Sequence, residues 1–124
     1  MRLLLVLAGG ALGSGARYLI ALWMAARFGA VFPWGTLTVN VLGSFLIGLI
    51  ATFADEHGAL SANLRVLLIV GLLGGFTTFS SFSIETLRLI ESDTPIRAAV
   101  YVAGSLVLTL GAAMIGVAVG RALH

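Results

Sequence analysis

The chain has 124 residues, of which 60% are hydrophobic and 10% are charged, and its mean hydropathy is +1.12. A water-soluble domain of this size could not bury so much apolar surface, so the composition excludes a soluble globular protein. The formal net charge of +2 comes from scattered arginines without any lysine, and the chain has no cysteine. These features exclude a nucleic-acid-binding patch, disulfides and thiolate metal sites.

Apolar windows of about 20 residues predict four transmembrane helices in a single domain that covers the whole chain. The expected spans are residues 3–26, 34–54, 64–90 and 96–120. The first apolar run is too long for the core of a signal peptide, so we expect it to remain in the protein. Pro33 and Pro95 both stand where a helix is expected to begin, in agreement with the preference of proline for the first helical turn.

The first span contains Arg17 in the motif GGALGSGARY. A charge inside a span must reach toward the nearer surface, or pair with a helix C-terminus or with a carboxylate such as Glu85. We therefore assign structural or vestibule roles to Arg17 and to Glu85, which lies toward the end of the third span. G-x-x-x-G spacings occur in this span and in two others, and they predict close packing of helix backbones.

Polar side chains recur at every fourth position of the second and fourth spans, so each set shares one helix face. The two sets are Thr36, Asn40 and Ser44, within GTLTVNVLGSFLIG, and Tyr101, Ser105 and Thr109. Serine and threonine can bond to carbonyls of their own helix, but the amide of Asn40 needs partners outside it. Asn40 is therefore either a contact between helices or part of the wall of a hydrated path. Tyr101 is either an interfacial aromatic residue or a member of the same path.

The third span contains GLLGGFTTFSSFS at residues 71–83, where two adjacent glycines precede a cluster of hydroxyl and phenyl side chains. Each glycine costs about 1 kcal/mol of helix propensity, so we expect the helix to break in mid-membrane at Gly74 and Gly75. Freed backbone groups must then be buried or line a cavity, which is a recurring way to bind ions. Phe79 and Phe82 are either packing residues or electropositive ring edges that face an anion beside hydroxyls such as that of Ser80.

The arginines that flank the spans are divided equally between the two sides of the membrane. Arg2, Arg65 and Arg121 lie on one side, and Arg27, Arg88 and Arg97 lie on the other. The positive-inside rule then indicates no preferred orientation. Either the balance is a coincidence of a small sample, or the chain inserts in both orientations and pairs antiparallel. Four thin helices with small-residue stripes are poorly suited to enclose a transport path alone, which favours an oligomer.

The motifs GGALGSGARY, GTLTVNVLGSFLIG and GLLGGFTTFSSF together resemble the Fluc family of bacterial fluoride channels, over essentially the whole chain. Ser81 stands where threonine is usual and Ser14 where alanine is common, and neither change removes a chemical function. The resemblance implies an all-α integral membrane protein of the bacterial cytoplasmic membrane that forms an antiparallel, dual-topology homodimer. Its function would be passive efflux of fluoride, which protects the cell from fluoride toxicity.

The resemblance also implies roles for individual residues. Backbone carbonyls of Gly74 and Thr77 would hold a structural sodium ion at the dimer centre. The fluoride path would be lined by Asn40, Phe79, Ser80, Phe82, Tyr101 and Ser105. The ion and the dimer are thus expectations from the resemblance, whereas the polar stripes and the weak point in the third span follow from the residues themselves.

Two other functions remain open from the sequence. A proton-coupled efflux transporter of the small multidrug resistance kind also has four helices and often dual topology. Its coupling needs a carboxylate at the membrane centre, and no Asp or Glu stands at the centre of any expected span. A non-transporting membrane subunit built on glycine-mediated packing is the second alternative. An enzyme is not expected, because the spans hold no nucleophile–base pair and no cluster of metal ligands.

Overall fold

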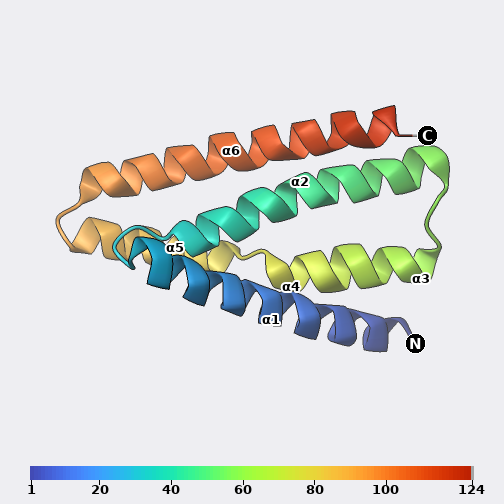
Figure 1. Ribbon diagram of the computed structural model, residues 1–124, viewed down its shortest axis with the longest axis horizontal. Coiled ribbons are helices and arrows are strands. Elements are labelled where there is room, and N and C mark those ends of the chain that lie inside the picture. Colours follow the sequence, from blue (N-terminus) through green and yellow to red (C-terminus); the bar gives the residue numbers. More distant parts are fainter. Residues whose placement is uncertain (124) are drawn as a thin grey trace.

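The computed structural model describes residues 1–123, which form long helices joined by short turns. Four helical segments are long and apolar enough to cross a membrane, with mean hydropathies between 1.6 and 2.2. They are α1 (Arg2–Phe28), α2 (Trp34–His57), a composite third segment (Ala62–Glu91) and α6 (Pro95–Ala122). The segments run side by side and place both termini at the same end (Figure 1). The predicted all-α fold with four spanning helices is confirmed.

The helices extend a few residues beyond the predicted spans because local capping, not hydropathy, decides where they stop. Gly58 ends α2 with a left-handed φ of 58°, and its N–H donates to the carbonyl of Ala54. Ser61 begins the third segment, where its hydroxyl accepts from the N–H of Leu64 at 3.2 Å. Pro95 occupies the first turn of α6.

The third segment is not one continuous α-helix. It consists of α3 (Ala62–Arg65), the π-helical stretch η1 (Val66–Leu73), α4 (Gly74–Phe76) and α5 (Phe79–Glu91). Thr77 and Thr78, between α4 and α5, have extended backbone with φ, ψ of −88°, 159° and −152°, 123°. The ribbon in Figure 1 shows this interruption between the two labelled helices.

The predicted position of the weak point is wrong, because Gly74 and Gly75 are helical and the extended residues follow them. At Gly75 the reason is a helix contact. An ideal β carbon there would lie 2.6 Å from the carbonyl oxygen of Gly10 in α1, so any larger side chain would push the helices apart. The glycine therefore serves the approach of two backbones and does not unwind its own helix.

The G-x-x-x-G spacings act in helix packing as predicted. Between α1 and η1, a β carbon at Gly9 would lie 2.5 Å from the carbonyl oxygen of Leu67, and one at Gly13 would collide with Leu72. Between α6 and α2, a β carbon at Gly116 would collide with the carbonyl of Phe45. These contacts join the chain into two closely packed pairs, α1 with the third segment and α2 with α6 (Figure 1).

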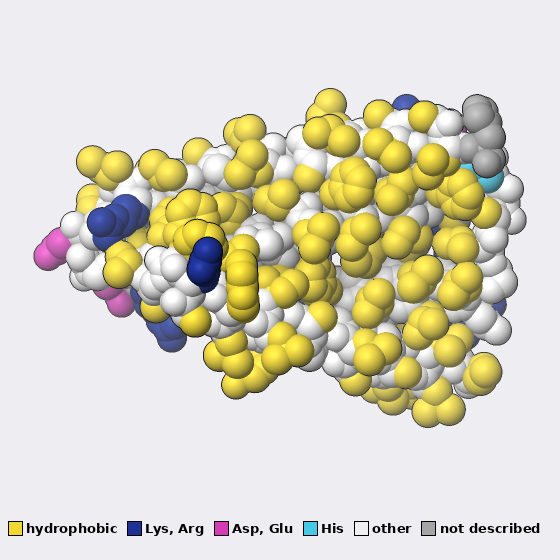
Figure 2. Space-filling view, viewed as in Figure 1, with side chains coloured by type: hydrophobic (Ala, Val, Ile, Leu, Met, Phe, Trp, Pro, Cys, Tyr) yellow, Lys and Arg dark blue, Asp and Glu magenta, His cyan; other side chains and the backbone are white. Residues whose placement is uncertain are grey.

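The outer surface of the bundle is apolar, as lipid contact requires. Hydrophobic side chains cover the face in Figure 2, and the charged side chains that are visible lie mostly toward the two ends. At the end that holds the termini, Arg121 pairs with Glu56 at 3.0 Å, and Arg65 pairs with Asp55. Only Val39 and Tyr101 are fully buried among the larger side chains of the described residues.

Candidate ion path and cation site

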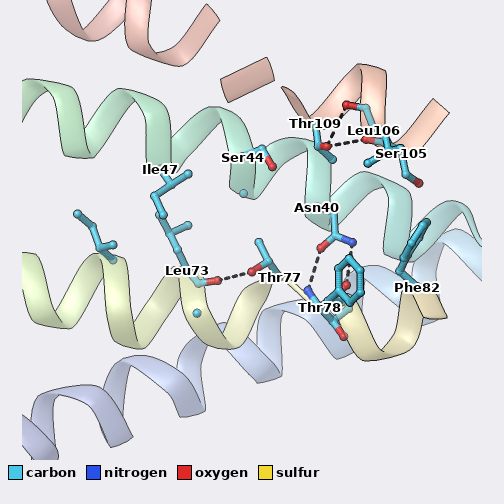
Figure 3. Close-up of a pocket in the computed structure, with 14 residues that line it drawn as sticks. Asn40, Ser44, Ile47, Leu73, Thr77, Thr78, Phe82, Ser105, Leu106 and Thr109 are labelled. Atoms are coloured by element: carbon cyan, nitrogen blue, oxygen red, sulfur yellow. Dashed lines mark hydrogen bonds between the residues drawn. The ribbon is translucent and has the colours of Figure 1, made fainter. Parts of the chain in front are cut away.

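A cavity of about 330 Å³, here called the central pocket, lies between α2, the interrupted third segment and α6. Polar side chains enter it from α2 and α6, and Thr77 and Thr78 enter it from the third segment (Figure 3). The predicted path residues among its lining are Asn40, Phe79, Phe82 and Ser105. No charged side chain lines this pocket in the described part of the chain.

Asn40 binds the extended backbone of the third segment with both ends of its amide (Figure 3). Its Nδ2 donates to the carbonyl of Thr78 at 2.9 Å, and its Oδ1 accepts from the N–H of Thr78 at 2.8 Å. The two interpretations of Asn40 from sequence therefore do not exclude each other. The residue makes a contact between helices and also lines the central pocket, where the second N–H of its amide is not used in these two bonds.

The two threonines of the interruption satisfy the helix ends on either side. Thr77 donates from both its N–H and its hydroxyl to the carbonyl of Leu73, each at 3.0 Å. The hydroxyl of Thr78 accepts from the N–H of Ser81 at 3.1 Å and so caps α5. Sequence reasoning missed this role of Thr78, although a threonine directly before a helical run is an N-cap signal.

Arg17 reaches the same region from α1. Its Nε donates to the carbonyl of Gly75 at 3.1 Å, and the hydroxyl of Ser14 lies 3.5 Å from the same oxygen. Of the partners that the sequence left open for Arg17, the structure shows the helix C-terminus and not Glu85. Glu85 instead accepts from the hydroxyl of Thr36 at 2.6 Å.

Glu85 and Thr36 belong to a second cavity of about 540 Å³ at the end of the bundle near the α1–α2 connection. Arg88 and Trp34 also line this cavity. Charged and aromatic side chains thus meet in this cavity, and the vestibule role of Glu85 stays a prediction. Arg17, the other residue expected at a vestibule, does not line it.

The predicted aromatic residues form a short chain of ring contacts. The rings of Phe79 and Phe82 have centroids 5.4 Å apart, and those of Phe82 and Tyr101 are 5.1 Å apart. Tyr101 is fully buried, so its ring packs inside the chain. It does not line the central pocket but packs against Phe82, which does. Phe79 is 78% exposed on the single chain, at the rim of the pocket.

Ser80 and Ser105 differ in position. Ser80 is exposed and its hydroxyl lies 3.3 Å from that of Thr78, but it is not part of the central pocket lining. Ser105 is buried and lines the pocket, and its carbonyl accepts from the hydroxyl of Thr109 at 2.5 Å. Sequence reasoning had placed Thr109 in the polar stripe of α6, and the structure places it in the same pocket.

Gly74 in α4 and Thr77, which follows this helix, are the residues expected to hold a cation through their carbonyls. The last carbonyls of a helix lack partners within it and carry the negative end of its dipole. Gly74 and Thr77 both line the central pocket, and neither carbonyl receives a side-chain hydrogen bond in the described part of the chain. The described residues contain no cluster of three acidic, histidine or cysteine side chains. The sodium site stays a prediction for these two residues, whose carbonyl oxygens are ligands that suit a hard cation.

Comparison with known proteins shows similarity along nearly the whole chain. Residues 4–117 match the family described as CrcB-like protein, Camphor Resistance (CrcB). The chain is 50% identical over 121 residues to the fluoride-specific ion channel FluC of Rhizobium meliloti (strain 1021), which covers 98% of this chain and 97% of the relative. It is 53% identical over 122 residues to the protein of the same name from Thermus thermophilus, covering 98% and 95%. The corresponding protein of Agrobacterium fabrum is 46% identical over 119 residues, covering 96% and 95%.

Proposed function

We infer that this chain, which belongs to the CrcB-like protein family, is a fluoride-selective ion channel. Its relatives named as fluoride-specific channels align with it over almost their full length. With its four candidate spans it is a multi-pass protein of a bacterial membrane, and it is a channel and not an enzyme. Its role is passive efflux of fluoride across the cytoplasmic membrane, which protects the cell from fluoride toxicity.

The observation that carries this proposal is the chemistry of the central pocket, which offers neutral hydrogen-bond donors and aromatic ring edges to an ion. Fluoride gives up its water only where other donors replace it, and it must not be held too tightly to leave. The amide of Asn40 and the hydroxyl of Ser105 supply donors, and the edges of Phe79 and Phe82 supply weak positive potential. We also assign to the path Ser80, whose hydroxyl lies 3.3 Å from that of Thr78, and Tyr101, which packs against Phe82, although neither residue lines the central pocket.

The absence of a carboxylate from the described lining of this pocket argues against proton-coupled transport. Glu85, the acidic residue nearest to it along the third segment, belongs to the other cavity and is hydrogen-bonded to Thr36. A transporter of the small multidrug resistance kind would need an acid at the centre. A non-transporting subunit would need no polar pocket at all.

The functional unit in this proposal is an antiparallel homodimer of two oppositely inserted copies. The balanced arginines favour dual topology. Phe79 is exposed at the rim of an open pocket, so we propose that a second copy covers it and forms the remaining wall of the path. The interruption at Thr77 and Thr78 divides the third segment into nearly equal halves, Ala62–Phe76 and Phe79–Glu91. In a membrane it would therefore lie near mid-depth.

A structural sodium ion at the centre of this dimer is the remaining part of the proposal. The carbonyls of Gly74 and Thr77 from each copy would hold it. When bound, the ion supplies positive charge that offsets the negative ends of the half-helices and ties the two copies together. The residues present fit such an ion, since both line the pocket and no side-chain donor in the described part of the chain competes for their carbonyls.

The test is ion flux from liposomes that contain the purified protein. Fluoride release, followed with a fluoride electrode, should be rapid and should not depend on a proton gradient. Chloride release from matched liposomes should stay at the level of protein-free vesicles. Equal fluoride and chloride release, or fluoride release only when a proton gradient drives it, would contradict the proposal.

A further inference from the structure

We propose that Arg17 and Asn40 are positioning residues for the cation site, which they shape by occupying the backbone groups beside the two ligand carbonyls. This inference rests on the proposed sodium site. In addition, we propose that Arg17 and Asn40 do not touch the ion. Their hydrogen bonds occupy neighbouring carbonyls, so that only the carbonyls of Gly74 and Thr77 are free to bind the ion.

Asn40 binds the backbone on the C-terminal side of the proposed ligand Thr77. Its amide takes both the N–H and the carbonyl of Thr78, at 2.8 and 2.9 Å, as a neighbouring β-strand would. Thr78 is therefore fixed in extended conformation, with its carbonyl already used. Because Thr77 is the preceding residue, the bond to the Thr78 N–H also sets the plane of the peptide group that contains the Thr77 carbonyl.

Arg17 binds the backbone on the N-terminal side of the proposed ligand Thr77. Its Nε donates to the Gly75 carbonyl at 3.1 Å, and it can reach this atom because Gly75 lets α1 approach so closely. The guanidinium also places a positive charge at that oxygen. A second cation could not share the Gly75 carbonyl without repulsion, so Arg17 removes this carbonyl from the possible ligands.

The occupied carbonyls and the lining of the central pocket together leave two ligands that are three residues apart. Leu73, Gly75 and Thr78 accept side-chain hydrogen bonds from Thr77, Arg17 and Asn40. Gly74, Phe76 and Thr77 accept no such bond in the described part of the chain, and of these three only Gly74 and Thr77 line the central pocket. The selection thus depends on side chains from α1 and α2 and not on the third segment alone.

One consequence is a coupling between the two proposed ion sites. Asn40 lines the pocket through which the anion would pass and also fixes the residue next to a cation ligand. A change at Asn40 should therefore alter cation binding as well as anion flux. A residue that only donated to the anion would leave cation binding unchanged.

The experiment is a sodium titration of the purified, full-length protein in detergent, with large organic cations replacing sodium. The readouts are the temperature of unfolding, the fraction of dimer, and hydrogen exchange at the Thr78 amide. The variants are Arg17→Met, Arg17→Lys, Asn40→Ala and Asn40→Asp. Matched controls are Arg27→Lys, which keeps the charge of an exposed arginine on the same helix as Arg17, and Thr38→Val, on the same helix as Asn40 but outside the central pocket.

We expect the sodium concentration at half-effect to rise by about fivefold or more in Arg17→Met and Asn40→Ala, as the loss of one or two hydrogen bonds predicts. Arg17→Lys should lie between parent and Arg17→Met, because lysine keeps a charged donor. Exchange at the Thr78 amide should accelerate in Asn40→Ala but not in Asn40→Asp, whose carboxylate still accepts from that N–H. Both controls should titrate like the parent.

The outcomes separate this inference from the proposal on which it rests. If the parent responds to sodium and the Arg17 and Asn40 variants respond at the same concentration, the positioning roles are wrong and the sodium site stands. If the parent shows no response to sodium, the site and its positioning residues both fail, whatever the fluoride flux. Should a variant at Asn40 not fold, Arg17→Lys and Arg17→Met decide the question by the same titration.

Discussion

The amide of Asn40 and the backbone of Thr78 form a two-way hydrogen-bonded pair, with N···O distances of 2.9 and 2.8 Å. A side chain of α2 thus provides the hydrogen-bond donor and acceptor that a neighbouring β-strand would provide for an extended residue. Lipid offers no hydrogen-bond partners, so an interrupted backbone must be satisfied from within the protein or in a cavity, and Asn40 supplies both backbone partners of Thr78. The same side chain lines the proposed anion path.

Asn40→Asp separates donation from acceptance at this position. The carboxylate keeps an acceptor for the Thr78 N–H but loses the donor to its carbonyl, and it adds a negative charge to the path. Two like charges about 4 Å apart repel by about 4 kcal/mol at an effective dielectric constant of about 20, so fluoride flux should fall at least about tenfold. Liposome efflux measures this, and size-exclusion chromatography should still show a dimer. Flux equal to that of Thr38→Val would remove Asn40 from the path.

Phe79→Ile and Phe82→Ile distinguish ring electrostatics from packing. Isoleucine keeps apolar bulk but has no electropositive edge, so both variants should conduct fluoride more slowly than the parent. Both variants lose the ring contact between Phe79 and Phe82, and Phe82→Ile also loses the contact with Tyr101, so it should lower the free energy of unfolding by about 1 kcal/mol more than Phe79→Ile. Thermal unfolding and efflux are measured on the same preparations. If both variants conduct like the parent, the phenyl rings serve packing alone.

The contact between Gly43 and Thr77 allows a test of the cation site, because a side chain at position 43 would displace the backbone of a proposed ligand. A β carbon at Gly43 would collide with the methyl group of Thr77, so Gly43→Ala should displace Thr77 at a cost of about 1–3 kcal/mol and raise the sodium requirement of the dimer. Thr77→Ser removes that methyl group and keeps the carbonyl and the hydroxyl. It should change little alone and should restore sodium binding when combined with Gly43→Ala. Sodium-dependent thermal unfolding checks both, and a double variant as impaired as Gly43→Ala would contradict the prediction.

Topology is tested by reporters fused to the C-terminus. Because the flanking arginines are balanced, reporters that are active only in the cytoplasm and only in the periplasm should both give signal. Two or three lysines added to the α1–α2 connection should bias insertion and lower fluoride efflux from cells. Efflux should return when a copy with the opposite bias is co-expressed. A signal from one side only, with crosslinks between parallel copies, would rule out dual topology.

Several features followed from the sequence because they depend on composition and local spacing. Hydropathy over windows of helical length is enough to predict four spans, since lipid admits only apolar helices of that length. The periodicity of four places Asn40 and Ser105 on faces that turn toward one pocket. The glycine spacings likewise predicted close contacts between helix backbones.

The place of the interruption and the partners of Arg17 and Asn40 were decided only by the tertiary structure. Propensity pointed to Gly74 and Gly75, but the approach of α1 uses Gly75 for packing and leaves it helical. The extended residues are Thr77 and Thr78, because Asn40, 38 positions before Thr78 in the chain, supplies the hydrogen bonds that a helix would otherwise supply. Such a contact cannot be predicted from local sequence. The free energy that stabilises it comes from groups on different helices, which are close only after the helices pack.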